Sequence, residues 1–296
     1  MKTELVDVVK AQNTLGEGVI WDHISGCVYW TDIKEAKLYS FSFENDDPDI
    51  FDLPENLCAF GLTQMTGRFI CAFSSGFYFF NIETGERERI KLIEKDWAGS
   101  RMNDGRMDRK GRFWTGTMIE DPSNQPPNGA ALYSLSRKSV KKHFDGVSIS
   151  NGIAWSPDNK VMYFADSPNR KIYTFDYDID QCDVRNRRDF TNLPIGAFPD
   201  GATIDEEGCL WVALWGAGEV VRFSPEGEIL HKINIEARQP TCVSFAGKDL
   251  NYLCVTSARE GLSQEALQAE PHSGDLFIYE TDVRGLQETL FDEDLL

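Results

Sequence analysis

The sequence predicts an all-β protein, a six-bladed β-propeller made of four-stranded antiparallel blades. A short alternating strand begins six times along the chain, at spacings of 41 to 49 residues. These strands are too short, and too rich in β-branched and aromatic residues, to be helices. Six such units fill nearly all of the 296 residues, so we expect one domain over residues 1–296.

The first strand of each unit is marked by one residue at a constant phase. The markers are Gly18, Gly61, Gly105, Gly152, Gly201 and Cys242. Their segments read GEGVIWD, FGLTQM, NDGRMD, SNGIAWS, PDGATID and PTCVSFA. In a propeller the first strand of each blade lines the central axis.

Further strands follow each marker, separated by turn signals such as SPDNK and SPEG. The second strands read CVYWTD, RFICAF, RFWTGT, VMYFAD, CLWVAL and YLCVTS. The third strands read KLYSFSF, GFYFFNI, ALYSLS, KIYTFDY, EVVRFSP and DLFIYET. A fourth strand is visible in four units, as ERERIKL (86–92), VKKHF (140–144), RRDF (187–190) and EILHKI (228–233).

The stretch from Glu4 to Val9 reads as a spare strand before the first unit. A ring left unclosed exposes two sheet edges, which invite aggregation. We therefore expect this N-terminal strand to complete the last blade beside residues 275–280.

Composition excludes several classes of function. The formal net charge is −18, and so acidic a surface repels nucleic acids. No apolar run reaches the roughly 20 residues of a membrane span, and the start of the chain is charged where a signal peptide is apolar. The seven cysteines include no CxxC pair, which favours buried free thiols and a cytoplasmic location. The sequence does not indicate an oligomeric state.

Four polar residues directly precede their markers: Glu17, Asp104, Asn151 and Asp200. Because equivalent positions of different blades converge, we expect all four at one mouth of the axis. Three carboxylates in a narrow space repel one another unless a cation lies among them. Oxygen ligands favour one hard divalent ion such as Ca²⁺, Mg²⁺ or Mn²⁺, and Zn²⁺ also accepts them.

Neighbouring residues extend this predicted site. Arg101 and Asn103 lie just ahead of the third marker, and alternation sends them to the side opposite Asp104. Glu120 follows the second strand of the same unit and leads into the segment 121–129. That segment is too long for a hairpin turn, so it forms either part of a lid or a plain surface loop.

Four segments together resemble the senescence marker protein, regucalcin and gluconolactonase family. They are LGEGVIWD, RMNDGRMDRKGRFWTGTM, SNGIAWSPDNK and PDGATIDEEGCLWVALW. The resemblance covers nearly the whole chain and implies a six-bladed propeller that binds one divalent metal ion and hydrolyses sugar lactones. It also implies that Glu17, Asn151 and Asp200 are the metal ligands. The segment around SARE (257–260) resembles bacterial sugar-lactone hydrolases of the group.

The same resemblance implies that Arg101 and Asn103 hold hydroxyl groups of the substrate, and that Glu120 is a further substrate contact. For the chemistry, we expect Asp200 to be the general base, with Asp104 as the alternative. We expect a polar pocket that binds a small sugar lactone.

Two other functions are compatible with the same residues: a phosphotriesterase-like hydrolase and a non-enzymatic calcium-binding propeller. A serine hydrolase is disfavoured because the chain has no G-x-S-x-G motif, and its four histidines fall at different phases of the repeat.

Overall fold

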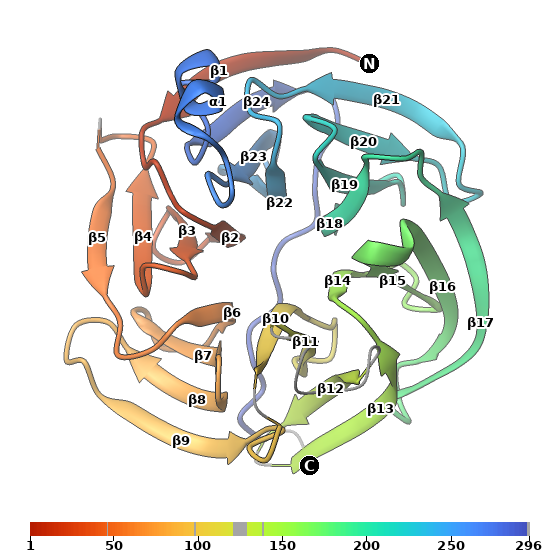
Figure 1. Ribbon diagram of the computed structural model, residues 1–296. Coiled ribbons are helices and arrows are strands. Elements are labelled where there is room, and N and C mark those ends of the chain that lie inside the picture. The colour runs from red at the N-terminus through yellow and green to blue at the C-terminus, as the bar shows by residue number, and fades with distance from the viewer. Residues whose placement is uncertain (46, 98, 121–128, 138, 295–296) are drawn as a thin grey trace.

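The computed structural model describes residues 1–45, 47–97, 99–120, 129–137 and 139–294. Its strands form six four-stranded antiparallel sheets, arranged as blades around a common axis (Figure 1). The predicted six-bladed propeller is therefore confirmed. The segment 121–129, which we considered as a lid, lies outside the described residues except for Gly129.

Each of the first three blades begins at the axis and ends at the rim. Blade 1 contains β2 (Gly16–Asp22), β3 (Cys27–Asp32), β4 (Lys37–Ser42) and β5 (Asp49–Asp52). Blade 2 contains β6 (Leu57–Leu62), β7 (Arg68–Phe73), β8 (Gly76–Asn81) and β9 (Arg87–Leu92). Blade 3 contains β10 (Ser100–Met107), β11 (Phe113–Ile119), β12 (Ala130–Ser136) and β13 (Ser139–Val147).

The next two blades follow the same order. Blade 4 contains β14 (Ser150–Trp155), β15 (Val161–Asp166), β16 (Lys171–Asp178) and β17 (Asp183–Asn192). Blade 5 contains β18 (Phe198–Ile204), β19 (Leu210–Trp215), β20 (Glu219–Phe223) and β21 (Ile229–Asn234). Two short helical segments, the 3-10 turn η2 (Ser167–Asn169) and the helix α1 (Gln264–Ala269), lie in connections between strands.

Blade 6 closes the ring with both ends of the chain. It contains β22 (Pro240–Ala246), β23 (Tyr252–Ser257), β24 (Leu276–Thr281) and the N-terminal strand β1 (Thr3–Val9). The β1 strand pairs antiparallel with β24, from Thr3 opposite Thr281 to Val9 opposite Leu276. The predicted closure is confirmed, and the sheet edge that an open ring would expose is paired.

The six inner strands share an irregularity that strict alternation does not predict. Each shifts its register against the second strand of its blade. The shift lies at or beside the marker residue in five blades, and in blade 2 it lies between Leu57 and Ala59, ahead of the marker. Such a bulge inserts an extra residue, bends the strand and changes the direction of nearby side chains. At Gly18 and Gly152 the backbone has a φ of 62° and 60°, a left-handed conformation that glycine adopts without strain.

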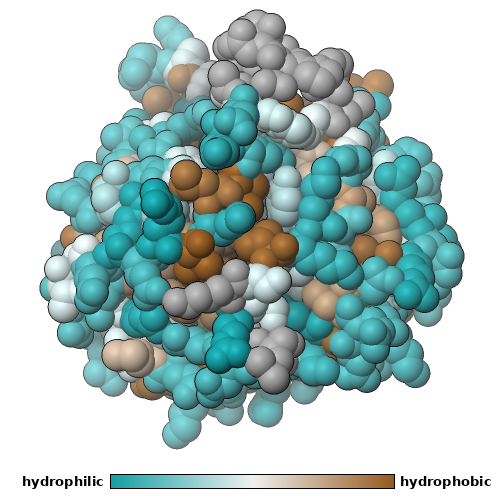
Figure 2. Space-filling view, turned by 90° about the horizontal axis from the view of Figure 1, so that it is seen from below, coloured by the Kyte–Doolittle hydropathy of each residue, from teal (hydrophilic) through white to brown (hydrophobic). Residues whose placement is uncertain are grey.

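The core lies between the blades. Large aromatic side chains on the second strands, including Trp30, Trp114 and Trp211, are completely buried. The rim is different: where the ring is seen edge-on, from below the view of Figure 1, hydrophilic side chains cover most of the surface around a smaller hydrophobic group (Figure 2). All seven cysteines are free thiols. In the part of the chain that the structure describes, no helix is long and apolar enough to cross a membrane.

The C-terminal segment after β24 crosses the ring from blade 6 to blades 2 and 3 (Figure 1). Its backbone bonds to that of residues 206, 62 and 111 in turn. Phe291 is fully buried in the core cluster that contains Phe79. This segment links blade 6 to blades 5, 2 and 3 across the face on which the inner strands end.

Candidate functional site

A cavity of about 340 Å³ lies at the mouth of the axis where the inner strands begin. Five of the residues predicted from the sequence line it: Glu17, Arg101, Asn103, Asn151 and Asp200. They come from β2, β10, β14 and β18, which belong to four different blades. The shared phase of the repeat therefore brings these side chains together.

Two of the carboxylates that line the cavity, those of Glu17 and Asp200, are nearly inaccessible to solvent. Glu17 is 9% exposed and Asp200 is 7% exposed. Burial raises the pKa of Glu17 to about 8, and the charge of Asp104 contributes in the same direction. Burial also raises the pKa of Asp200, with further contributions from Glu17 and Asp104. Among the described residues, neither Glu17 nor Asp200 forms an ion pair with a cationic side chain.

A chain of hydrogen bonds fixes the amide at this site. Arg101 Nη1 donates to Asn103 Oδ1 at 2.7 Å, and Asn103 Nδ2 donates to Asn151 Oδ1 at 2.9 Å. Asn151 Nδ2 donates to Ser167 Oγ at 2.8 Å, and that hydroxyl donates to the carbonyl oxygen of Pro199 at 2.7 Å. Because its amide nitrogen is engaged by Ser167, the orientation of Asn151 is set by its neighbours.

The side-chain oxygens of Glu17, Asn151 and Asp200 fit a divalent cation. Two buried carboxylates without a cationic partner are costly to ionise, and a cation between them removes that cost. Within the described ranges, no group of three His, Cys, Asp or Glu side chains could hold a metal ion. A cation at this site would therefore be held by the carboxylates of Glu17 and Asp200 and by the amide oxygen of Asn151, all of them oxygen ligands.

Asp104 shares the phase of these residues but does not line the cavity. Its carboxylate accepts a hydrogen bond from the backbone nitrogen of Ile153 at 3.2 Å. Burial raises the pKa of Asp104, and the nearby guanidinium of Arg106 opposes this shift. Asp104 thus lies outside the cavity lining but within electrostatic reach of Glu17 and Asp200.

Glu120 lies at the edge of the site rather than in its wall. Its Oε1 accepts a hydrogen bond from Arg101 Nε at 2.7 Å and forms an ion pair with Lys34 Nζ at 2.7 Å. Lys34 also lies 3.2 Å from Glu260 Oε1, and Glu260 lines the cavity. Burial alone would raise the pKa of Glu120, but the bonds from Lys34 and Arg101 outweigh it and lower that pKa.

The expectation of a polar pocket is only half right. Half of the lining residues are apolar, namely Leu15, Met118, Ile149, Pro168, Phe198, Pro199 and Trp215. Most of these residues stand at strand ends or in connections, where periodicity indicates burial but not contact with a ligand. Ser167 and Lys34 were also missed, since each is a single polar residue after a second strand.

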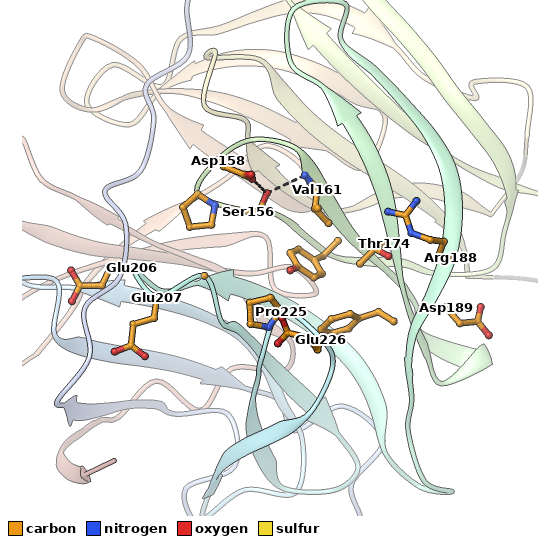
Figure 3. Close-up of a pocket in the computed structure, with 14 residues that line it drawn as sticks. Ser156, Asp158, Val161, Thr174, Arg188, Asp189, Glu206, Glu207, Pro225 and Glu226 are labelled. Atoms are coloured by element: carbon orange, nitrogen blue, oxygen red, sulfur yellow. Dashed lines mark hydrogen bonds between the residues drawn. The ribbon is translucent and has the colours of Figure 1, made fainter.

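A larger cavity, of about 580 Å³, lies between blades 4 and 5 at the opposite ends of their inner strands. Figure 3 shows Glu206 and Glu207 on one side of it and Arg188 and Asp189 on the other. Its acids do not converge: Asp189 pairs with Lys171, and Glu207 pairs with Arg222. No residue predicted for the site lies there.

The ring of six blades defines the class, a six-bladed β-propeller with a partly polar cavity at one mouth of its axis. Residues 15–259 match the family model described as the SMP-30/Gluconolactonase/LRE-like region. The chain belongs to this family, as its sequence motifs indicate.

Relatives across nearly the full length are named as lactonases. The chain is 37% identical to 6-deoxy-6-sulfogluconolactonase of Pseudomonas putida over 98% of this chain and 99% of that protein. It is 35% identical to L-arabinolactonase of Azospirillum brasilense over 95% and 93%. Among solved structures, regucalcin of Agrobacterium tumefaciens, described as a calcium-binding protein, superposes with a TM-score of 0.92 at 29% identity, covering 97% of this chain and 98% of that one.

Proposed function

We propose that the protein is a metal-dependent sugar lactonase that hydrolyses a gluconolactone-like aldonolactone to the aldonic acid. The observation that carries this proposal is the pair of buried carboxylates, Glu17 and Asp200, facing an open cavity of about 340 Å³ beside Asn151. That volume suits a small ligand. The names of the relatives support the reaction class.

In this proposal Glu17, Asn151 and Asp200 hold one divalent ion. Their oxygen atoms suit Ca²⁺, Mg²⁺ or Mn²⁺, and Zn²⁺ is compatible. The name of the Agrobacterium relative favours calcium. When bound, the cation supplies a Lewis acid that polarises the carbonyl of the lactone.

Asp200 is the proposed general base, because its carboxylate lines the cavity. It accepts a proton from a water molecule as the water oxygen attacks the carbonyl carbon. The ring C–O bond then breaks, and the same proton passes to the departing ring oxygen, which leaves the acid and a free hydroxyl group. Asp104 is the weaker candidate, since its carboxylate accepts the Ile153 amide instead of facing the cavity.

Arg101, Asn103 and Glu120 are the proposed contacts for the hydroxyl groups of the substrate. Arg101 is held by both of the others, through Asn103 Oδ1 and Glu120 Oε1. This arrangement fixes donors and acceptors before the substrate binds, which reduces the entropy that binding costs. The apolar lining residues Phe198 and Trp215 would contact the C–H face of the ring and exclude water.

The test compares wild type with Asp200→Ala on gluconolactone, with and without a chelator. We expect the substitution to lower kcat/KM by at least about 10³-fold, because it removes both a ligand and the base. Chelation should abolish turnover, and added Ca²⁺ or Zn²⁺ should restore it. Glu226→Gln, in the larger cavity between blades 4 and 5, is the matched control. Metal-stimulated hydrolysis by Asp200→Ala would refute the assigned site.

A non-enzymatic calcium-binding propeller is the second candidate, favoured by the name of the Agrobacterium relative. Calorimetry separates the two: calcium binding at Glu17 without hydrolysis of any lactone would support this candidate. A phosphotriester included in the assay tests the phosphotriesterase alternative.

The free thiols suit a reducing compartment, so a cytoplasmic location is part of the same proposal.

A further inference from the structure

Lys34 joins two carboxylates from different blades at the edge of the candidate site. It follows β3 of blade 1, and its Nζ lies 2.7 Å from Glu120 Oε1 and 3.2 Å from Glu260 Oε1. Glu120 follows β11 in blade 3, and Glu260 follows β23 in blade 6. We call Lys34, Glu120 and Glu260 the mouth bridge.

The mouth bridge is anchored by backbone contacts but is open to a ligand. The backbone nitrogen of Glu260 donates to the carbonyl of Thr14 at 2.9 Å, and Gln239 Nε2 donates to the Glu260 carbonyl at 3.1 Å. The side chains of Lys34, Glu120 and Glu260 are 29%, 38% and 41% exposed. Ion pairs this exposed add little to stability, so folding alone gives a weak reason for the arrangement.

The bridge has spare hydrogen-bonding capacity of both kinds. A lysine ammonium group has three N–H donors, and two are engaged here. Each carboxylate has a second oxygen, and neither Glu120 Oε2 nor Glu260 Oε2 bonds to another of the described residues. A hydroxyl group both donates and accepts hydrogen bonds, so it matches this mixture of donor and acceptors.

Charge separates two kinds of substrate. The cations Lys34 and Arg101 are balanced by the anions Glu120 and Glu260, so the mouth bridge together with Arg101 carries no net charge. An anionic substituent at Lys34 would lie beside the carboxylates of Glu120 and Glu260, which repel it, and the chain as a whole carries −18. The Pseudomonas putida relative is named for a lactone with a sulfo group, so the choice between neutral and anionic substituents is a real one for this family.

We propose that Lys34 and Glu260, together with Glu120, determine specificity by selecting lactones with a neutral, hydroxyl-bearing substituent over lactones with an anionic one. This inference rests on the proposed lactonase function. The lactone carbonyl would lie toward Glu17 and Asp200, and the substituent would reach the mouth bridge.

The test measures kcat and KM of wild type, Lys34→Met and Glu260→Gln on three substrates. These are gluconolactone, its 6-deoxy-6-sulfo analogue and δ-valerolactone, which has no hydroxyl groups. We expect wild type to prefer gluconolactone over the sulfo analogue by at least about tenfold. Each substitution should lower kcat/KM for gluconolactone by about tenfold, mainly through KM, and leave δ-valerolactone within about twofold. Glu35→Gln, in the same loop and outside the cavity, is the control.

The two substitutions have opposite effects on charge, and a merely structural role would not reproduce that difference. Glu260→Gln gives the mouth bridge and Arg101 a net positive charge, so it should shift the substrate preference toward the sulfo analogue. Lys34→Met gives the same set of side chains a net negative charge and should shift the preference away from the sulfo analogue. Equal losses on all three substrates, shifts of the same sign, or a wild type that prefers the sulfo analogue would overturn the inference while the lactonase function stands. Hydrolysis of none of the three lactones would refute the proposed function itself.

Discussion

Glu17 makes the stability of the metal-free protein depend on pH in an unusual direction. Its pKa is raised from an ordinary value of 4.5 to about 8, chiefly by burial. Between these two pH values the folded state therefore binds more protons than the unfolded state. The free energy of unfolding must fall as the pH rises from about 4.5 to about 8, and then level off. Most carboxyl groups have the opposite effect.

The size of this effect follows from the shift. A displacement from 4.5 to about 8 corresponds to a loss of at most about 5 kcal/mol across that interval. Asp200 titrates with Glu17 as a repelling pair, which spreads the loss over a wider range of pH. Because Gln cannot ionise, the Glu17→Gln variant should not lose the part of the unfolding free energy that wild type loses when Glu17 ionises. In chelator, we expect equal stability of wild type and variant near pH 5 and a more stable variant at pH 8.5.

The assay is denaturant unfolding of both proteins from pH 5 to pH 8.5, once in chelator and once with excess Ca²⁺. Adding Ca²⁺ should reverse the order at pH 8.5, because the wild type gains binding energy and the variant lacks a ligand. The exposed residue Glu44 supplies the control, and Glu44→Gln should follow wild type throughout. The reasoning is wrong if metal-free wild type is as stable as Glu17→Gln at pH 8.5.

Two further predictions concern the scaffold, both measured by chemical denaturation. Phe291→Ala should lower the free energy of unfolding by about 3–5 kcal/mol, since this side chain of the C-terminal segment is fully buried; a cost no larger than that of the exposed Met65→Ala would contradict the assigned packing. Asp108→Asn should cost about 3 kcal/mol or more, because it leaves the buried guanidinium of Arg112 without its carboxylate. Asp180→Asn, which removes an exposed ion pair, is the control and should cost less than about 1 kcal/mol.

The repeat could be predicted from the sequence because three strands of every blade bury an apolar face and alternate accordingly. The outermost strands carry less of this signal. Asp49–Asp52 forms β5 although it is short, acidic and largely exposed, and only pairing with β4 shows it to be a strand. The path of the C-terminal segment was not predicted either, because it depends on contacts with distant blades rather than on a periodic pattern.

The residues of the candidate site also fall into those that the sequence predicts and those that it does not. Its residues on inner strands could be predicted, since the phase of the repeat places Glu17, Asn151 and Asp200 at one mouth. The residues that come from connections, such as Lys34 and Ser167, could not be, because no periodicity constrains where a loop directs a single side chain.

The bulges of the inner strands explain why residues at one phase have different environments. Asp104 accepts the Ile153 amide of the neighbouring blade and lies near the guanidinium of Arg106. Its charge is thereby turned away from the cavity and partly offset. Of the three carboxylates at this phase, only Glu17 and Asp200 then line the cavity, and their two negative charges balance one divalent cation. A third in contact with the ion would leave a net negative charge, which would weaken the polarisation of a bound carbonyl. We infer that the withdrawal of Asp104 keeps the proposed metal site strong enough as a Lewis acid to act on a lactone.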